Sequence, residues 1–288
     1  MLLPAFACIF VFHYVPLAGW IIAFKNYNVG SSLLEAEWIG LSQFKTFFLE
    51  TSDFVYIIRN TLVMNVLTLI VTLSSSFCFA ILINELPSRR TARVVQTVSF
   101  FPFFVSWVIT YSIIHALFSA STGAINVALI RLGIIEKGLD VLGGERYAWP
   151  LIVAMNGWKS LGYGSVIFLA AIAGIPREQF EAAEIDGAGR FGRIWHVTVP
   201  NMMPTLVVLL ILNSGWILSS DFSQYFLFTN PTNWERMEVF DMYVYKFGLK
   251  LLNYPYATAV GIVKTVVSLF ILLNVNLISR KVHGRAIF

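Results

Sequence analysis

Three long segments of this chain contain no formally charged residue. They lie between Arg59 and Glu85, between Arg93 and Arg131, and between Arg193 and Asp221. The whole chain is 57% hydrophobic and only 12% charged, whereas soluble domains carry roughly 25% charged residues. Since about 20 apolar residues cross a bilayer as a helix, the sequence predicts a polytopic membrane protein. The same composition excludes a disordered or coiled-coil chain.

Six apolar stretches are long enough to cross the hydrocarbon core as helices. The short alternating segments that are typical of membrane barrels are missing from the sequence. We therefore predict an all-α membrane protein with six transmembrane helices, in a single domain over residues 1–288. The predicted spans are Leu2–Phe24, Leu62–Ile83, Val94–Phe118, Ala148–Ile175, Val197–Ser220 and Tyr256–Ile278.

Basic residues predict the orientation. They are dense in the two short links after spans two and four and in the tail: Arg89, Arg90, Arg93, Arg177, Arg190, Arg193, Arg280, Lys281 and Arg285. The longer links, 25–53, 119–147 and 221–255, have nearly as many basic residues at lower density. Because the positive-inside bias acts on short loops, we expect both termini and the short links in the cytoplasm. The net charge of +4 is thereby explained without a nucleic-acid partner.

The link between spans four and five, residues 176–200, predicts two short helices. Pro176 suits a first helical turn, where its missing amide hydrogen is not needed. Asp186-Gly187 should end that helix, because glycine adopts backbone conformations that other residues avoid. An amphipathic helix along the inner membrane surface should follow, before Pro200 and Pro204 start span five. Its apolar residues recur at helical spacing: Phe191, Ile194, Trp195 and Thr198. Such a link either covers the bundle or offers a rigid surface to a cytoplasmic partner.

Lys159 is the most informative polar residue at membrane depth. It lies about 11 residues, or roughly 17 Å, beyond Ala148 and therefore near mid-membrane. An ammonium exposed there costs several kcal/mol, so it should face a cavity or a carboxylate. Either it pairs structurally with a second subunit or it contacts an anionic or hydroxyl-rich substrate. Lys264 lies closer to the outer surface and could reach it.

Other side chains could line a substrate path, because amides and aromatic faces bind sugars. The alternative for each is helix packing or an interhelical hydrogen bond. The candidate substrate path comprises Asn156, Trp158, Lys159, Asn213, Trp216 and Lys264. The sequence has no G-x-x-x-x-G-K-[ST] or H-E-x-x-H motif and its four histidines are scattered, so we expect no catalytic residue and no metal site.

The 176–200 link resembles the EAA loop of binding-protein-dependent ABC importer permeases. It has E-A-A, two residues, D-G-A, and a hydrophobic segment that ends in proline: Glu181, Ala182, Ala183, Asp186, Gly187, Ala188 and Pro200. The opening residues His13-Tyr14-Val15-Pro16 and the later run Tyr256–Gly261 are similar to carbohydrate-uptake permeases of the oligosaccharide and polysaccharide branch. Those permeases usually have a basic leader, whereas Met1 lies within the apolar run, so the orientation of span one rests on the other loops.

The resemblance implies a non-catalytic permease subunit in a bacterial inner membrane. Its expected partners are a second, homologous permease subunit, two ATPase subunits that bind ATP and Mg²⁺, and a solute-binding protein outside. Residues Glu181–Ala183 and Asp186–Ala188 are expected to couple to the ATPase. The substrate is expected to be an oligosaccharide or polysaccharide fragment, and an acidic one such as alginate if Lys159 and Lys264 line the path. Residues 221–255 either meet the solute-binding protein or form a lid.

Two other functions fit the residues without the resemblance. An ion-coupled secondary carrier would use Lys159 and Asp221 as charge elements and would need no ATPase. A structural or sensor subunit of the membrane would transport nothing.

Overall fold

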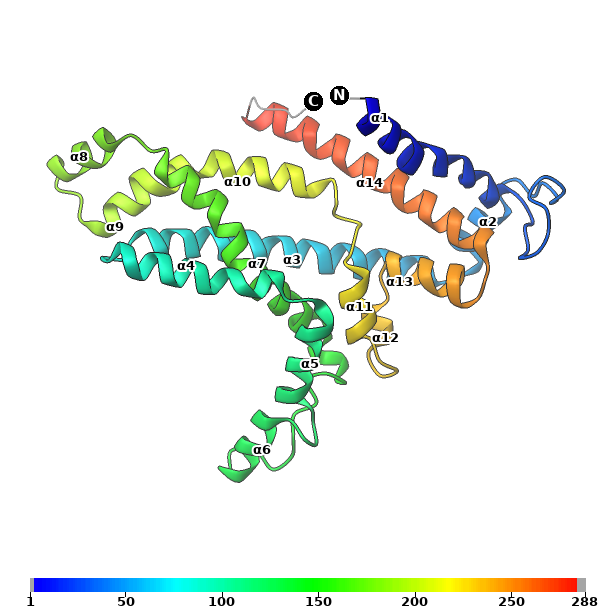
Figure 1. Cartoon of the computed structure of the whole chain (residues 1–288), viewed down its shortest axis with the longest axis horizontal. Helices are drawn as coiled ribbons and strands as arrows, with labels where there is room; N and C mark the ends of the chain where they lie inside the picture. Colours follow the sequence, from blue (N-terminus) through cyan, green and yellow to red (C-terminus); the bar gives the residue numbers. More distant parts are fainter. Residues whose placement is uncertain (1–2, 284–288) are drawn as a thin grey trace.

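The computed structural model describes residues 3–283 of the chain. Within this range, one isolated antiparallel bridge joins Lys25 to Trp38, and the remaining regular structure is helical. The long helices run roughly along one axis, and the short helices α8 and α9 lie together at one end of it (Figure 1). They are α3 (Asp53–Asn84), α4 (Arg89–Phe104), α7 (Glu145–Ala173), α10 (Val199–Ser214) and α14 (Tyr254–His283).

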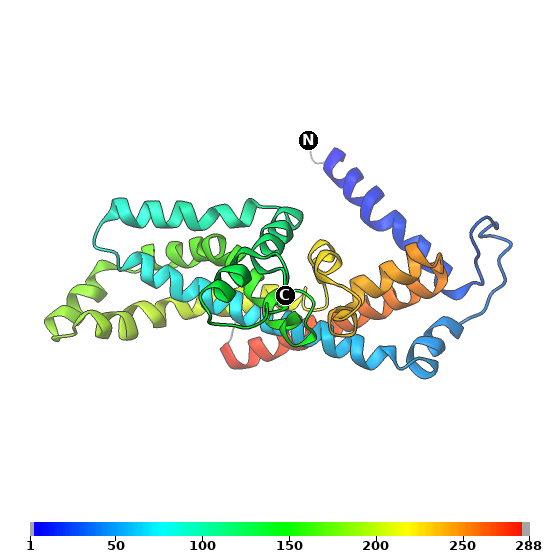
Figure 2. The same ribbon diagram turned by 90° about the horizontal axis from the view of Figure 1, so that it is seen from below.

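Shorter helices flank these. They are α1 (Leu3–Ile9), which continues as a helix to Phe24, α2 (Ser42–Lys45), α5 (Trp107–Phe118), α6 (Ala124–Arg131), α8 (Arg177–Ile185), α9 (Arg190–Arg193), α11 (Phe222–Phe228), α12 (Trp234–Met237) and α13 (Phe240–Tyr245). The start of the N-terminal helix projects away from the rest of the chain in a view from below (Figure 2), whereas its second half, Val15–Phe24, contacts α14. Only Ala23 of its residues is buried.

Four helices in the described range are long and apolar enough to cross a membrane: Leu3–Phe24, Asp53–Asn84, Arg190–Ser214 and Tyr254–Leu277. Two bent pairs also qualify, α4 with α5 and α7 with α8. The all-α membrane fold is thus confirmed, with up to six spans if each bent pair crosses once. The count of six stays a prediction.

The third predicted span is not one straight helix. The chain breaks between Phe104 and Trp107 and turns by 102° into α5, which leaves the bundle together with α6 (Figure 1). Pro102 lies just before the break and has no amide hydrogen to donate. The Ser106 hydroxyl then accepts a hydrogen bond from the Ile109 amide and starts a new helix. The prediction of a continuous helix over Val94–Phe118 is therefore wrong.

The fifth span begins earlier than predicted. One helix runs from Arg190 to Ser214, so the amphipathic segment and the span are continuous and Pro200 lies in the first turn of α10. A π-helical turn, Ile194–Thr198, precedes α10, and in it the Val199 amide donates to the Ile194 carbonyl five residues earlier. This wider turn accommodates the proline without ending the helix.

Glycines on α7 allow two helices to approach it closely. A Cβ atom on Gly162 would lie 2.2 Å from the backbone oxygen of Ser99 in α4. On Gly164 it would lie 2.3 Å from the Ser76 hydroxyl of α3. Small residues at such contacts are typical of membrane helix packing. Because its glycines allow both α3 and α4 to pack closely, α7 lies at the centre of the bundle.

The substitution Gly162→Ala should loosen this bundle. The added methyl group meets backbone rather than a flexible side chain, so α4 must move away from α7. We expect the free energy of unfolding to fall by about 1–3 kcal/mol, measured as thermal unfolding in detergent. Gly261→Ala in α14 is the matched control, because nothing lies within 4 Å of its Cβ position. Equal stability of the two variants would contradict the close contact.

Candidate functional site

The predicted coupling residues form a helix and a tight turn. Helix α8 ends at Ile185, and Gly187 has a φ of +80°, in the left-handed region. The Gly187 amide donates to the Glu184 carbonyl at 3.0 Å, and the Ala188 amide donates to the Ala183 carbonyl at 2.8 Å. This pair of bonds closes a helix C-terminus around a glycine. The prediction that Asp186-Gly187 ends the helix is confirmed.

This turn is fixed to the membrane helices from two sides. Phe180 and Ala183 pack against a buried cluster formed by Ala80, Phe168, Ile172, Ile175, Val197 and Met202. On the other side, the Arg190 Nε atom pairs with Glu85 Oε2 at 2.6 Å, and its Nη2 atom donates to the Glu85 carbonyl at 2.5 Å. Movement of α8 would therefore be transmitted to α3, α7 and α10.

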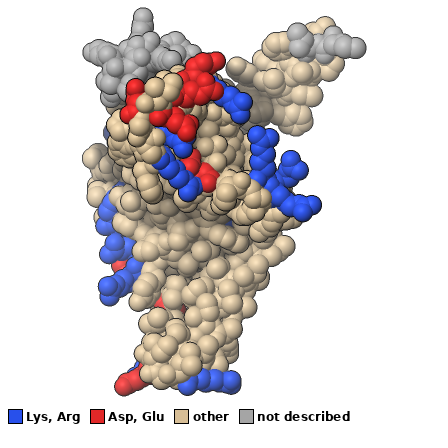
Figure 3. All heavy atoms as spheres, turned by 90° about the vertical axis from the view of Figure 1, so that its left-hand side faces the viewer, with Lys and Arg blue, Asp and Glu red and all other residues tan. Residues whose placement is uncertain are grey.

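On the outer surface of the same segment, Glu181 and Asp186 form no ion pair with a residue that the structure describes. Glu181, Ala182, Asp186 and Gly187 are exposed, whereas Ala183 and Ala188 are half-buried. Three large apolar side chains are also exposed there: Ile185 is 87%, Phe191 84% and Trp195 69% accessible. Charged groups gather at this end of the molecule (Figure 3). The surface can accept a partner that offers both apolar and polar contacts.

Lys159 lies at the break between α4 and α5. Its Nζ atom donates to the Pro102 carbonyl at 3.1 Å and to the Val105 carbonyl, and it lies 4.8 Å from the centre of the Trp107 ring. The Pro102 carbonyl also accepts from the Val105 amide at 3.2 Å, whereas the Val105 carbonyl lies in the break itself, so the buried ammonium supplies a donor where the helix ends. Among the described residues Lys159 forms no ion pair.

A cavity of about 400 Å³ adjoins Lys159. Asn156 and Asp221 also line it, but both are engaged: Asn156 donates to Gln224 Oε1 at 2.9 Å, and Asp221 accepts from the Trp107 indole at 2.8 Å. The sequence predicted a cavity or a carboxylate beside Lys159. The structure has the cavity, and carbonyl oxygens rather than a carboxylate meet the charge.

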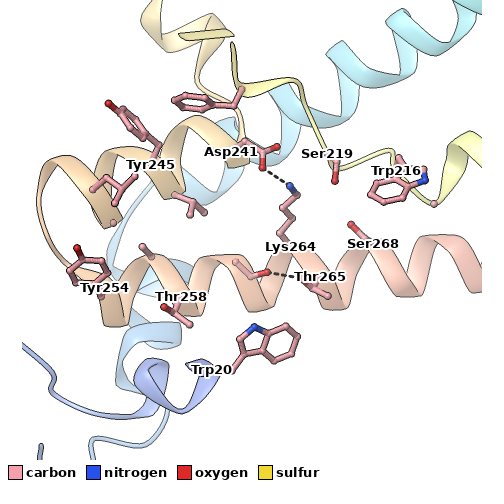
Figure 4. Close-up of a pocket in the computed structure, with 17 residues that line it drawn as sticks. Trp20, Trp216, Ser219, Asp241, Tyr245, Tyr254, Thr258, Lys264, Thr265 and Ser268 are labelled. Carbon is pink, nitrogen blue, oxygen red and sulfur yellow. Dashed lines mark hydrogen bonds and ion pairs between the residues drawn. The ribbon is translucent and has the colours of Figure 1, made fainter. Parts of the chain in front are cut away.

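A larger cavity, of about 950 Å³, lies between α14, α13 and the segment after α10. Lys264 pairs there with Asp241 at 2.6 Å, rather than extending to the membrane surface as the sequence allowed. Figure 4 shows the pair between aromatic and hydroxyl side chains. Those in the lining are Trp20, Trp216, Ser219, Phe222, Tyr245, Tyr254, Thr258, Thr265 and Ser268.

The six predicted path residues do not all line one cavity of this chain, and their role in a substrate path stays a prediction. Lys159 and Asn156 line the smaller cavity, and Lys264 and Trp216 the larger one. Trp158 and Asn213 line neither of these two cavities. Trp158 is exposed on α7, and the Asn213 amide donates to the Leu209 carbonyl of its own helix at 2.8 Å.

Sequence reasoning missed Asp241 and Trp20 as cavity residues. Asp241 falls in a link that was assigned to the outer surface, and no local pattern indicates its pairing with Lys264, 23 residues away.

Burial raises the pKa of the nearby Tyr225, and the Asp241 and Asp221 carboxylates raise it further, so its phenol stays neutral. Among the side chains that the structure describes, no group of three or more His, Cys, Asp or Glu residues could hold a metal ion.

Several known proteins resemble this chain over nearly its whole length. Protein LplB of Bacillus subtilis (strain 168) is 38% identical over 100% of this chain and 90% of its own length. The polygalacturonan/rhamnogalacturonan transport system permease protein YteP of the same organism is 36% identical over 100% of this chain and 89% of its own length.

A solved structure has the same fold. A chain of the bacterial alginate ABC transporter, crystallised with an alginate pentasaccharide-bound periplasmic protein, superposes with a TM-score of 0.90. It is 34% identical and covers 100% of this chain, which in turn covers 95% of it. The family model for the binding-protein-dependent transport system inner membrane component matches residues 76–284. That match spans well over half of the sequence, so the chain belongs to this family of inner membrane transport components.

Proposed function

We propose that this chain is a transmembrane permease subunit of an ATP-driven ABC importer that takes up oligosaccharides or polysaccharide fragments. The observation that carries the proposal is the exposed turn at Asp186-Gly187, which is rigidly joined to three membrane helices. Family membership favours this function over an ion-coupled carrier or a non-transporting subunit. The chain is one permease domain over residues 1–288, with its termini and the 176–200 link in the cytoplasm.

The proposed partners follow from the same family. Two ATPase subunits bind ATP and Mg²⁺, and a second homologous permease subunit completes the membrane part. Residues Glu181–Ala183 and Asp186–Ala188 contact an ATPase, since their outer surface has no partner within the described chain. A solute-binding protein delivers the substrate on the opposite side, by analogy with the periplasmic protein in the superposed alginate transporter complex.

We propose an acidic oligosaccharide as the substrate. Two of the similar proteins carry alginate and polygalacturonan in their names, and both of these are polymers of sugar acids. The larger cavity supports this class, because aromatic rings and hydroxyl groups surround the cation of Lys264. A carboxylate on the sugar could replace Asp241 as the partner of Lys264.

The substitution Lys264→Gln tests the substrate class. We expect uptake of a uronic-acid oligosaccharide to fall roughly tenfold relative to a neutral oligosaccharide of equal length, as expected for loss of one charged hydrogen bond. Radiolabelled uptake into vesicles that contain the whole importer measures both. Lys137→Gln on the exposed α6–α7 connection is the matched control. Equal loss for acidic and neutral substrates would assign Lys264 a structural role only.

A further inference from the structure

The first two turns of α4 carry an unpaired basic cluster. Arg89, Arg90 and Arg93 are all exposed, and none forms an ion pair with a residue that the structure describes. Glu85, the nearest acidic residue in the sequence, is already paired with Arg190. Figure 3 shows basic side chains on this end of the molecule that stand apart from the mixed acidic and basic group. A helix N-terminus disfavours cations, so the cluster lacks local compensation and attracts an anion.

An apolar groove continues along the same helix. Its cavity of about 410 Å³ is lined by Gln96, Thr97, Phe100, Phe101 and Phe104. These residues follow Arg89 and Arg93 at helical spacing, so the basic cluster and the groove share one face of α4. The adjoining face packs against α7, where Phe103 stacks on Tyr163 with ring centres 4.1 Å apart and Phe100 contacts the same ring at 5.8 Å.

The dimensions of this face match one lipid molecule. Arg93 and Phe104 are about 17 Å apart along the helix axis, and one leaflet contributes roughly half of a hydrocarbon core about 30 Å thick. The cationic end lies on the side of the 176–200 link, which is cytoplasmic in the proposed orientation. That leaflet carries the negative surface potential that attracts basic clusters next to a span.

We propose that this face of α4 is a binding site for one anionic phospholipid. Arg89, Arg90 and Arg93 bind the headgroup phosphate, and the groove at Phe100 and Phe104 holds an acyl chain. The lipid would fix α4 on its outer side just as α7 fixes it on the inner side. It would thereby support the helix that ends at the break beside Lys159.

Native mass spectrometry of the whole importer tests the site, with phosphatidylglycerol and phosphatidylcholine as probes. We expect the unaltered complex to retain phosphatidylglycerol preferentially. The triple variant Arg89→Gln, Arg90→Gln and Arg93→Gln should lower this preference at least tenfold, since each arginine near the surface contributes roughly fivefold. The matched control removes the same charge from the end of α6, the α6–α7 connection and the start of α7: Arg131→Gln, Lys137→Gln and Arg146→Gln. It should retain the preference.

Equal loss in the two triple variants, or no loss in either, would overturn the site. So would a triple arginine variant that keeps its phosphatidylglycerol but releases the ATPase subunits, because the cluster would then bind a protein. If that variant does not accumulate, the site can be tested on the unaltered complex with photo-cross-linkable phosphatidylglycerol. Cross-links on the α4 peptide support the site, and cross-links only elsewhere overturn it.

Discussion

The substitution Gly187→Val is expected to abolish oligosaccharide uptake while the permease still inserts and assembles. A β-branched side chain strongly disfavours the left-handed conformation found at Gly187, where φ is +80°. The strain is roughly 1–3 kcal/mol, which reduces the population of the native turn about 5- to 150-fold. Nothing lies within 4 Å of the Cβ position, so the effect comes from the backbone and not from a steric clash.

Reconstituted vesicles allow uptake and ATP hydrolysis to be measured on the same preparation. In the Gly187→Val importer we expect ATP hydrolysis that no longer responds to the substrate-loaded binding protein. Gly189→Val is the matched control, because Gly189 has open space around it and an extended backbone with φ of −66°. Normal uptake by Gly187→Val would show that the turn does not couple hydrolysis to transport.

The second large effect is expected for Lys159→Met. The methionine keeps the length of the side chain but removes the ammonium donor of the Val105 carbonyl. The Pro102 carbonyl loses one of its two donors and keeps the Val105 amide. Each buried carbonyl that loses its hydrogen bond costs about 1–3 kcal/mol. We therefore expect the free energy of unfolding to fall by roughly 1–3 kcal/mol, seen as a lower thermal midpoint in detergent.

Lys159→Arg retains a donor and serves as the control, with a smaller loss of stability. Uptake measured on the surviving protein separates the structural role from a substrate contact. A fall in acidic relative to neutral uptake would place Lys159 in the substrate path. Unchanged stability of Lys159→Met would contradict the role of its ammonium at the break.

Local patterns predicted the local parts of this fold. The uncharged segments indicated the helical membrane class. Asp186-Gly187 indicated the end of α8, because a glycine readily adopts the left-handed backbone conformation that ends a helix, as Gly187 does here. The 102° break at Phe104 was missed although Pro102 and Ser106 flank it. Apolar composition alone does not report a bend in a segment where both halves are hydrophobic.

Long-range contacts explain the other differences. The carbonyl partners of Lys159 lie 57 and 54 residues away in the chain, and the Lys264–Asp241 pair joins a span to a segment expected outside the membrane. Helical spacing places a side chain on a face of its own helix, but it does not identify the neighbouring element. The expected depth of Lys159 and Lys264 in the membrane therefore identified both as functional candidates. It did not show that they line two different cavities.

ATP-dependent uptake tests the proposed function most directly. Vesicles should contain this permease with its partner permease and ATPase subunits, and radiolabelled uronic-acid oligosaccharide should be supplied on the binding protein. We predict accumulation only when ATP is present on the ATPase side, and no accumulation when Glu181 and Gly187 are altered so that the ATPase is released. Uptake driven by an ion gradient without ATP would contradict an ATP-driven importer.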